Sequence, residues 1–156
     1  WLADAGRFDR ARELLKAELD NENSRSSIIH TDSALMELFR DDPDHDAAIA
    51  LGQRANQLSN YGGVLSLQTL ASVFADAGRT AEARSHLLLA VSQRRDNKVD
   101  DDDWYVLGRM AEHYGMPELA ADCFTRVEKS KLLLGRDVWH LAQRRLKVLA
   151  GDQAEK

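Results

Sequence analysis

Large hydrophobic residues recur along the chain at positions i, i+3 and i+7, a spacing that places them on one face of a helix. Leu67, Leu70 and Phe74 show this pattern, and Trp104 and Leu107 begin it again further along the chain. Only two prolines interrupt the sequence, and residues that favour helices, such as Ala, Leu, Arg and Glu, are frequent. The pattern therefore predicts an all-α protein.

We expect the helices to follow these hydrophobic stripes. The predicted ranges are 1–5 (a truncated stub), 8–20, 31–41, 45–58, 64–77, 80–94, 101–114, 117–130 and 135–149. The predicted connectors are 21–30, 60–63 and 96–100. The last helix carries a stripe of its own that includes Trp139, Leu146 and Leu149, as expected of a helix that covers the end of a stack.

Short turn phrases recur along the chain at a regular interval. Three phrases that contain a glycine each precede an alanine by five residues, and Pro43 precedes another alanine by the same distance. The alanines are Ala11, Ala48, Ala83 and Ala120, which are spaced by 37, 35 and 37 residues. This regularity indicates a repeated helical hairpin of about 36 residues.

The residues that flank these turns resemble those of a known repeat family. The last unit reads Trp104-x2-Leu107-Gly108 and later Ala120-x3-Phe124, which resembles the tetratricopeptide repeat (TPR) signature W-x2-L-G-x2-Y followed by A-x3-F. The preceding unit fills the same positions with Leu67, Leu70, Ala71, Phe74, Ala83 and Leu87. The unit around Pro43 matches more weakly, and the first unit is half missing.

The resemblance implies an all-α, right-handed superhelical solenoid of antiparallel helix pairs, with about three and a half repeats and a C-terminal capping helix. We expect one TPR-like domain over residues 1–150 and a disordered tail over 151–156. The expected parts are a half repeat at 1–22, a degenerate repeat at 30–60, repeats at 64–95 and 101–130, and the capping helix at 135–149.

Small residues and turn residues have a physical role in this arrangement. Gly108 and Ala71 allow two helices to approach closely, and the glycine after the first helix of a pair accepts a left-handed backbone at low cost. Pro117 lies where the next helix begins, where its missing N–H is not needed. The local signals and the repeat therefore predict the same fold.

Charge and composition narrow the classes of partner. The net charge of −5 does not favour binding to nucleic acid or to an anionic membrane, and no stretch reaches the roughly 18 apolar residues of a membrane span. Basic residues gather between Arg126 and Lys147, including Arg144 and Arg145. We interpret most of them as a solvated outer face of the capping helix. No aromatic residue interleaves with exposed arginines as base stacking would need, and Trp139 fits the apolar stripe with Leu146 and Leu149 better.

Nucleophilic catalysis has little support in the sequence. Cys123 is the only cysteine, so it forms no intrachain disulfide. It lies beside Phe124 on the packing side of a helix, which is typical of a buried structural thiol. No glycine-rich phosphate loop is present, since Gly62-Gly63 is too short. We therefore expect a non-enzymatic protein without a cofactor.

A metal site is also weakly supported. Acidic residues cluster at 41–46 and again at 100–103, and carboxylates do bind hard cations. The first cluster lacks the alternation and turn glycine of a calcium-binding loop, while Asp44 and Asp100 each stand where a helix begins. Helix capping explains both clusters, and the five histidines show no i, i+4 pair that would suggest zinc.

The concave surface is the best candidate site that the resemblance implies. In a stack of such hairpins, the first helix of each pair lines this surface, and its exposed polar side chains can hold an extended peptide or a partner helix. Tyr105 and Arg109 are residue types that dominate binding energy at interfaces. The predicted partner-binding residues are His30, Ser33, Glu37, Arg40, Gln68, Ser72, Asp76, Tyr105, Arg109, Glu112 and His113. The alternative for each is an ordinary solvated surface.

The sequence thus predicts a protein-protein interaction scaffold that binds another protein or peptide and is a fragment of a larger bacterial protein. The alternative is a structural spacer or self-association module, for example in a periplasmic envelope or polysaccharide-export assembly. In that case Leu14, Leu15 and Leu19 of the truncated first hairpin would face a second copy. Regulation of a catalytic domain elsewhere in the parent protein is a third interpretation. A cytoplasmic and a periplasmic location fit equally well.

Overall fold

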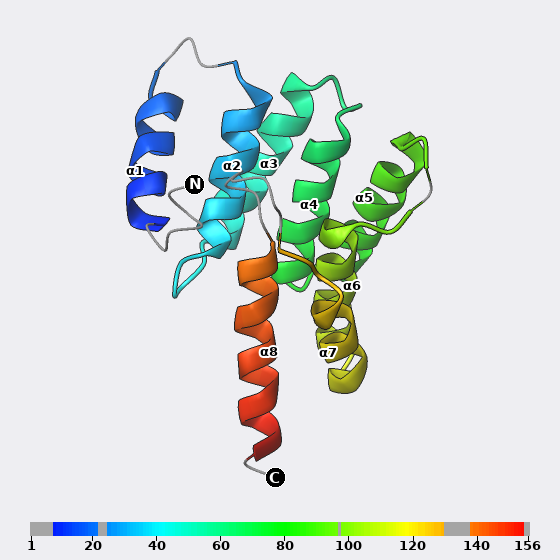
Figure 1. Cartoon of the computed structure of the whole chain (residues 1–156). Coiled ribbons are helices and arrows are strands. Elements are labelled where there is room, and N and C mark those ends of the chain that lie inside the picture. Colours follow the sequence, from blue (N-terminus) through cyan, green and yellow to red (C-terminus); the bar gives the residue numbers. More distant parts are fainter. Residues whose placement is uncertain (1–7, 22–24, 97, 130–137, 155–156) are drawn as a thin grey trace.

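The computed structural model describes residues 8–21, 25–96, 98–129 and 138–154 (Figure 1). Within these ranges the chain forms helices and no strand, so the predicted all-α class is confirmed. The helices are α1 (Phe8–Leu19), α2 (Ser27–Leu38), α3 (His45–Leu58), α4 (Val64–Asp76), α5 (Thr80–Gln93), α6 (Asp101–His113), α7 (Pro117–Thr125) and α8 (Trp139–Ala154). The predicted stub at 1–5 lies outside the described residues.

The clearest differences from the predicted helix boundaries are in α2, α7 and α8. The helix α2 begins at Ser27 rather than at residue 31, because the Ser26 side chain accepts a hydrogen bond from the Ile29 amide and caps the helix earlier. The helix α7 ends at Thr125 rather than at residue 130, and the next residues place Val127 in the core and the Glu128 amide on Asp101.

The third difference is at the C-terminus, where a disordered tail was expected from residue 151. Instead, α8 continues to Ala154, and only residues 155–156 lie outside the described part. The sequence of this segment contains Gln153 and Ala154, which favour helices, and no proline. The tail prediction is therefore wrong for residues 151–154.

Helix starts follow the predicted capping chemistry. The Asp44 side chain accepts a hydrogen bond from the Ala47 amide at 2.9 Å and caps α3. Asp100 and Asp103 form a reciprocal capping box at the start of α6, an arrangement that satisfies two amides that the helix leaves unpaired. Pro117 occupies the first turn of α7. Both acidic clusters thus supply helix caps, as predicted.

Consecutive helices pack as pairs, and the pairs contact one another in chain order. The pairs are α2 with α3, α4 with α5, and α6 with α7, while α4 contacts both α2 and α6. The matched alanines Ala48, Ala83 and Ala120 are each fully buried in the second helix of a pair. Every residue of α4 from Ser66 to Ala75 is buried, so this helix is the centre of the core.

Gly108 permits the closest packing within a pair. A Cβ atom at this position would lie 2.5 Å from a ring carbon of Phe124 in α7, closer than atoms of a folded protein approach. Phe124 is fully buried, and its ring also lies 6.0 Å, centroid to centroid, from that of Tyr105. The small residue that the repeat pattern placed here is therefore required by the packing of α6 on α7.

The final helix packs against α7 and α6 and extends beyond them at its C-terminal end (Figure 1). Its buried side chains belong to the same core as the paired helices. They are Val138 just before the helix, and Leu141, Ala142 and Leu149 within it. Burial of an aliphatic side chain of this size stabilises the folded state by about 1.5–3 kcal/mol, so α8 is an integral part of the fold.

Candidate functional site

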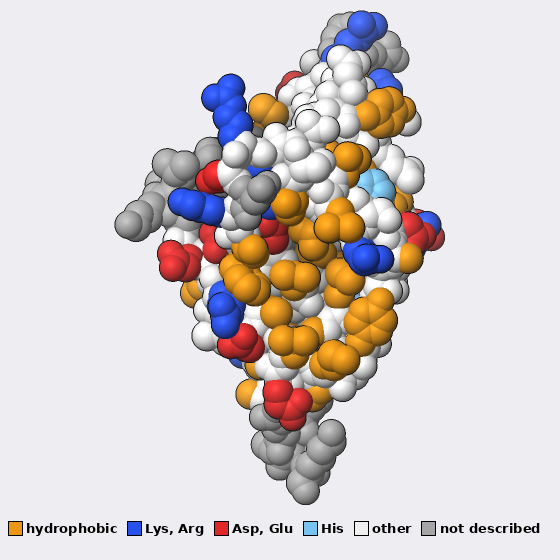
Figure 2. Space-filling view, turned by 90° about the vertical axis from the view of Figure 1, so that its right-hand side faces the viewer, with side chains coloured by type: hydrophobic (Ala, Val, Ile, Leu, Met, Phe, Trp, Pro, Cys, Tyr) orange, Lys and Arg blue, Asp and Glu red, His pale blue; other side chains and the backbone are white. Residues whose placement is uncertain are grey.

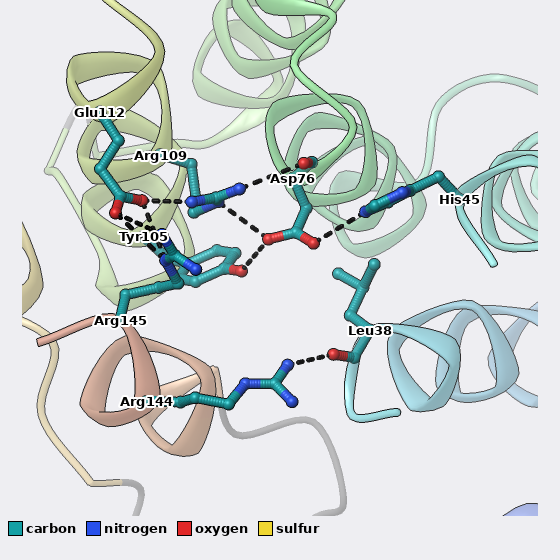
Figure 3. Close-up of polar contacts among 8 residues, drawn as sticks. All are labelled: Leu38, His45, Asp76, Tyr105, Arg109, Glu112, Arg144 and Arg145. Atoms are coloured by element: carbon teal, nitrogen blue, oxygen red, sulfur yellow. Dashed lines mark hydrogen bonds and ion pairs between the residues drawn. The ribbon is translucent and has the colours of Figure 1, made fainter. Parts of the chain in front are cut away.

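The C-terminal ends of α4 and α6 carry a connected cluster of charged and polar side chains (Figure 3). The Asp76 carboxylate accepts a hydrogen bond from the Tyr105 hydroxyl at 2.8 Å and pairs with Arg109 Nε at 2.9 Å. Its second oxygen lies 3.0 Å from Nε2 of His45 at the start of α3. Asp76 therefore joins three helices through one side chain.

The environment of Asp76 keeps this carboxyl group charged. Burial alone would raise the pKa of Asp76, but the Arg109 charge and the hydrogen bonds from His45 and Tyr105 lower the pKa below its ordinary value. Burial and the Asp76 charge raise the pKa of Tyr105 well above its ordinary value, so this hydroxyl remains a neutral donor. The cluster is thus a stable ion pair supported by a tyrosine.

Two arginines of α8 complete the cluster from the other side (Figure 3). Arg145 donates to both carboxylate oxygens of Glu112, with Nη2–Oε1 at 2.8 Å and Nε–Oε2 at 3.2 Å. Glu112 also pairs with Arg109. Arg144 donates to the backbone carbonyl groups of Leu38 and, at 3.2 Å, of Arg40. The helix α8 is therefore bound to the ends of α2 and α6.

The first helices of the three pairs, α2, α4 and α6, do not all end in the same way at this site. After α4, Gly78 has φ of 75°, and the Arg79 amide donates to the Phe74 carbonyl at 2.8 Å. Gly115 repeats this geometry after α6, with φ of 71°. Such glycines satisfy the last carbonyl groups of a helix. The turn after α2 has no glycine, and there Arg144 binds the free carbonyl groups instead.

The structure brings part of the predicted groove together. Asp76, Tyr105, Arg109 and Glu112 form the cluster described above, although they were predicted to lie on an exposed surface. Tyr105 is 1% exposed and Arg109 is 7% exposed. Their side chains are buried because they span from α6 to Asp76 and because α8 lies against Glu112. Contact of these residues with a partner remains a prediction and requires α8 to move.

The other predicted groove residues have separate environments. Gln68 is buried and donates to Asp100 at 2.6 Å, and Ser72 is fully buried. His30 bonds to the Ser26 carbonyl at 2.9 Å through Nδ1. His113 is exposed and lies beside Gly78. These four residues do not form a common site, and the expectation of exposure is wrong for Gln68 and Ser72.

Two predicted residues of α2 and a third that follows this helix line a hollow between α1 and α2. Ser33, Glu37 and Arg40 contribute to this hollow, whose volume is about 270 Å³. Glu37 pairs with Arg40 at 2.9 Å and lies 4.0 Å from Arg12 Nε. The other lining residues are Leu15, Lys16, Leu19, Met36 and Leu51. The hollow thus combines an apolar wall with more basic than acidic side chains.

Ser33 adds a polar group to this hollow. Its side chain is 5% exposed, so it is more buried than the expected groove surface. Among the described residues its hydroxyl makes no hydrogen bond. A buried hydroxyl without a partner is unfavourable by about 1–3 kcal/mol. A ligand group that reached Ser33 would relieve this cost.

Sequence reasoning missed three residues of the cluster. Arg144 and Arg145 were assigned to a solvated face of the capping helix, which is wrong because both side chains bind other helices. His45 was assigned only to a helix start, but it also contacts Asp76. Arg144 lies 104 residues from Arg40, so no local signal connected them. The absence of a glycine after α2 was the one available indication.

The other sites considered from the sequence are a reactive cysteine, a metal site and a membrane-spanning helix. Cys123 is buried. This burial, and to a lesser extent the nearby Asp122 charge, raises the pKa of its thiol. Throughout the described ranges no three His, Cys, Asp or Glu side chains are grouped so that they could hold a metal ion. None of the helices in those ranges combines the length and the apolar character that a membrane crossing requires.

One face of the molecule is rich in exposed hydrophobic side chains. Figure 2 views the side on which α5, α6 and α7 lie, and hydrophobic side chains gather across its middle. The large exposed hydrophobic residues of α5, α7 and the segment between them are Leu88, Leu89, Val99, Tyr114, Met116 and Leu119. Exposed apolar surface of this extent often marks an interaction site.

Comparisons with known proteins leave the geometry as the basis for any functional conclusion. No protein-family model matches the chain, and no curated protein or solved structure matches it.

Proposed function

We propose that the chain is a non-enzymatic protein-interaction scaffold, built as a right-handed solenoid of TPR-like hairpins. The proposal is supported by the pairing of successive helices and by buried alanines at matched positions. Two of these hairpins, α4–α5 and α6–α7, also share the same glycine geometry after their first helix. Stacked hairpins of this kind present extended surfaces that bind peptides or helices.

The hollow between α1 and α2 is the proposed contact point for the partner, and it is the observation that carries the proposal. It contains three of the predicted groove residues, an apolar wall and the Ser33 hydroxyl, which has no hydrogen-bond partner within the described part of the chain. Lys16 and Arg40 are exposed at its rim. An apolar pocket with a few polar groups is typical of a ligand-binding site. The expected ligand is a peptide or helix that places an apolar side chain in the hollow and an acidic group at the rim.

A random peptide library offers a direct test. Peptides that bind the immobilised protein would be selected, and their affinities would be measured for two variants with equal changes of charge. The first variant, Lys16→Glu with Arg40→Glu, alters the hollow. The second, Arg84→Glu with Arg95→Glu, alters exposed residues of α5 and the segment after it. We expect the first variant to weaken binding by at least about tenfold and the second to have little effect.

Equal weakening by both variants would show that binding depends only on overall charge and would contradict the proposed site. Selected peptides whose affinity is unchanged by the first variant would also contradict it. Circular dichroism of each variant would establish that the helices remain formed.

Self-association is a second candidate function, and the exposed hydrophobic face of α5, α6 and α7 favours it. Leu88 is 56% exposed and Leu119 is 51% exposed, so a second copy could cover them. Leu14 of α1, which was predicted to face a second copy, is 44% exposed. Sedimentation equilibrium of the wild type and of Leu88→Glu with Leu119→Glu distinguishes these surfaces. A strict monomer at high concentration would contradict this candidate.

A further inference from the structure

We propose that the hollow between α1 and α2 binds a tyrosine side chain of the partner peptide, whose hydroxyl group contacts Ser33 and whose acidic neighbour lies at the rim. The inference rests on the proposed function, which places an apolar side chain in this hollow, and it identifies that side chain. Three features of the hollow carry it: an apolar wall, a buried hydroxyl group, and more basic than acidic side chains. Together they favour an occupant that is apolar along its length and polar at its end.

The size and wall of the hollow limit its occupant to one large, mostly apolar side chain. The volume is about 270 Å³, just below the range of about 300–1,000 Å³ that holds drug-sized ligands. Leu15 and Leu19 of α1, Met36 of α2 and Leu51 of α3 supply the apolar surface. An inserted side chain therefore contacts apolar groups from three helices.

Ser33 places a polar group among these apolar side chains. It belongs to α2, is 5% exposed, and its hydroxyl makes no hydrogen bond with any described residue. This hydroxyl can both donate and accept a hydrogen bond. A leucine or phenylalanine side chain in the hollow would cover it without giving it a partner, which is unfavourable. The occupant therefore needs a polar atom that reaches Ser33.

The charge of the hollow favours tyrosine over tryptophan, the two side chains that join a large apolar ring to one polar atom. Among the described lining residues Arg12, Lys16 and Arg40 are basic, and Glu37 alone is acidic. Positive charge stabilises an oxygen that accepts a hydrogen bond and disfavours a group that only donates. The tyrosine oxygen can accept from Ser33, whereas the tryptophan N–H can only donate. Nearby cations also attract the face of an aromatic ring.

The rim of the hollow favours an acidic residue next to the tyrosine. Glu37 pairs with Arg40 at 2.9 Å and lies 4.0 Å from Arg12, so it balances only part of the positive charge. Lys16 is exposed and forms no ion pair with another described residue. A peptide carboxylate beside Lys16 would orient the chain across the rim. The recognised feature is thus a tyrosine followed or preceded by Asp or Glu.

The test uses four peptide libraries that differ at one position. Each contains random heptapeptides with glutamate beside a fixed central residue, which is tyrosine, phenylalanine, tryptophan or leucine. Binders would be selected on the immobilised full chain, and their dissociation constants would be measured. We expect the tyrosine library to give the tightest binders. Replacement of tyrosine by phenylalanine in those peptides should weaken binding by about three- to tenfold.

Two serine variants test the hydroxyl contact itself. In Ser33→Ala the tyrosine and phenylalanine forms of one peptide should bind within about twofold of each other, because the group that distinguishes them is gone. Ser72→Ala is the matched control. Ser72 is fully buried and its hydroxyl also lacks a hydrogen bond among the described residues, but it does not line the hollow. The control should keep the wild-type preference for tyrosine, and loss of that preference in both variants would overturn the inference.

Thermal melts test whether the Ser33 hydroxyl serves the fold instead. A serine in a helix can donate to the carbonyl group four residues earlier, and loss of such a bond would lower the melting temperature. Removal of a buried hydroxyl that has no partner should leave the melting temperature of Ser33→Ala at or above that of the wild type. A decrease of more than about 2 °C would show that the hydroxyl is bonded within the chain and would overturn the inference.

The outcomes separate this inference from the proposed function. Equally tight binders from the phenylalanine, tryptophan or leucine library would overturn the tyrosine inference. If Lys16→Glu with Arg40→Glu weakened those binders, the hollow would still stand as the binding site. A preference for tyrosine that persists in Ser33→Ala would also overturn the inference, since the tyrosine hydroxyl would then lie elsewhere. Absence of binders in all four libraries would overturn both proposals.

Discussion

The helices α2, α4 and α6 are each the first helix of a packed pair, yet their ends are closed by different parts of the chain. Gly78 and Gly115 close α4 and α6 with residues that directly follow the helix. After α2, local amides bind the Met36 and Glu37 carbonyl groups, but those of Leu38 and Arg40 accept from Arg144, which lies 104 residues beyond Arg40. Local caps can form as soon as each hairpin folds, whereas the Arg144 contacts at the end of α2 require α8 to dock.

Because of this difference, the stability of the α2–α3 hairpin depends on contacts with α8. Loss of α8 contacts leaves the ends of α4 and α6 closed but frees the carbonyl groups of Leu38 and Arg40. Free carbonyl groups at a helix end are satisfied by water only when they are exposed. The α2–α3 hairpin is thus stabilised by tertiary contacts, whereas the α4–α5 and α6–α7 hairpins are stabilised by their own turns.

The largest expected loss of stability comes from a change at Asp76, whose side chain joins α3, α4 and α6. Asp76→Ala should destabilise the protein by about 3 kcal/mol, because it leaves the buried Tyr105 hydroxyl without its acceptor and removes one of the two carboxylates that pair with the buried Arg109. Urea denaturation followed by circular dichroism measures this change. Asp122→Ala provides the control, since it removes an exposed pair with Arg126 and should change stability by less than about 1 kcal/mol. Equal effects of the two variants would contradict the role of Asp76.

Substitution of the turn glycines after α4 and α6 is expected to reduce stability by an intermediate amount. Gly115→Ala should cost about 1–2 kcal/mol from backbone strain alone, because no atom lies within 4 Å of the added Cβ. Gly78→Ala should cost somewhat more, since its Cβ would lie 3.1 Å from the His113 ring. Gly151→Ala is the matched control within a helix, where the same change should stabilise slightly. Thermal melts of all three variants test the comparison.

The smallest of these effects on stability should come from acid, through protonation of Asp76. The pKa of Asp76 is lower in the folded chain than its ordinary value of about 3.9. Its stabilising contribution is therefore fully present above that value and is lost as the pH falls through the lower, folded-state pKa. The unfolding free energy of Asp76→Asn should consequently fall less steeply than that of the wild type below about pH 4. Parallel curves for the two proteins would contradict the assigned pKa shift.

The sequence predicted the features that depend on neighbouring residues. The stripes with Leu67, Leu70 and Phe74 predicted α4, and the helix caps at Asp44 and Asp100 were confirmed. The left-handed glycines after α4 and α6 were also confirmed. These features arise within about one helical turn of the residues concerned, so a single sequence contains the information they require.

The features that depend on distant contacts were harder to predict. Tyr105 and Arg109 were expected on an exposed surface because their positions fall opposite the packing stripe, but their long side chains reach Asp76 of the preceding unit. Arg144 and Arg145 looked like solvated residues because the path of α8 across the helix ends is set by tertiary packing. Charge alone did not distinguish a solvated arginine from one that binds backbone carbonyl groups.

Hydrogen exchange of the three helix ends in Arg144→Ala tests the central claim most directly. The amides of residues 36–40 at the end of α2 should exchange at least about tenfold faster than in the wild type, since the lost contacts are hydrogen bonds from a charged donor. Residues 73–79 and 111–116, whose ends are closed by Gly78 and Gly115, should exchange at the wild-type rate. Equal acceleration at all three ends, or none at the end of α2, would contradict the claim that α8 stabilises the end of α2 and not the ends of α4 and α6.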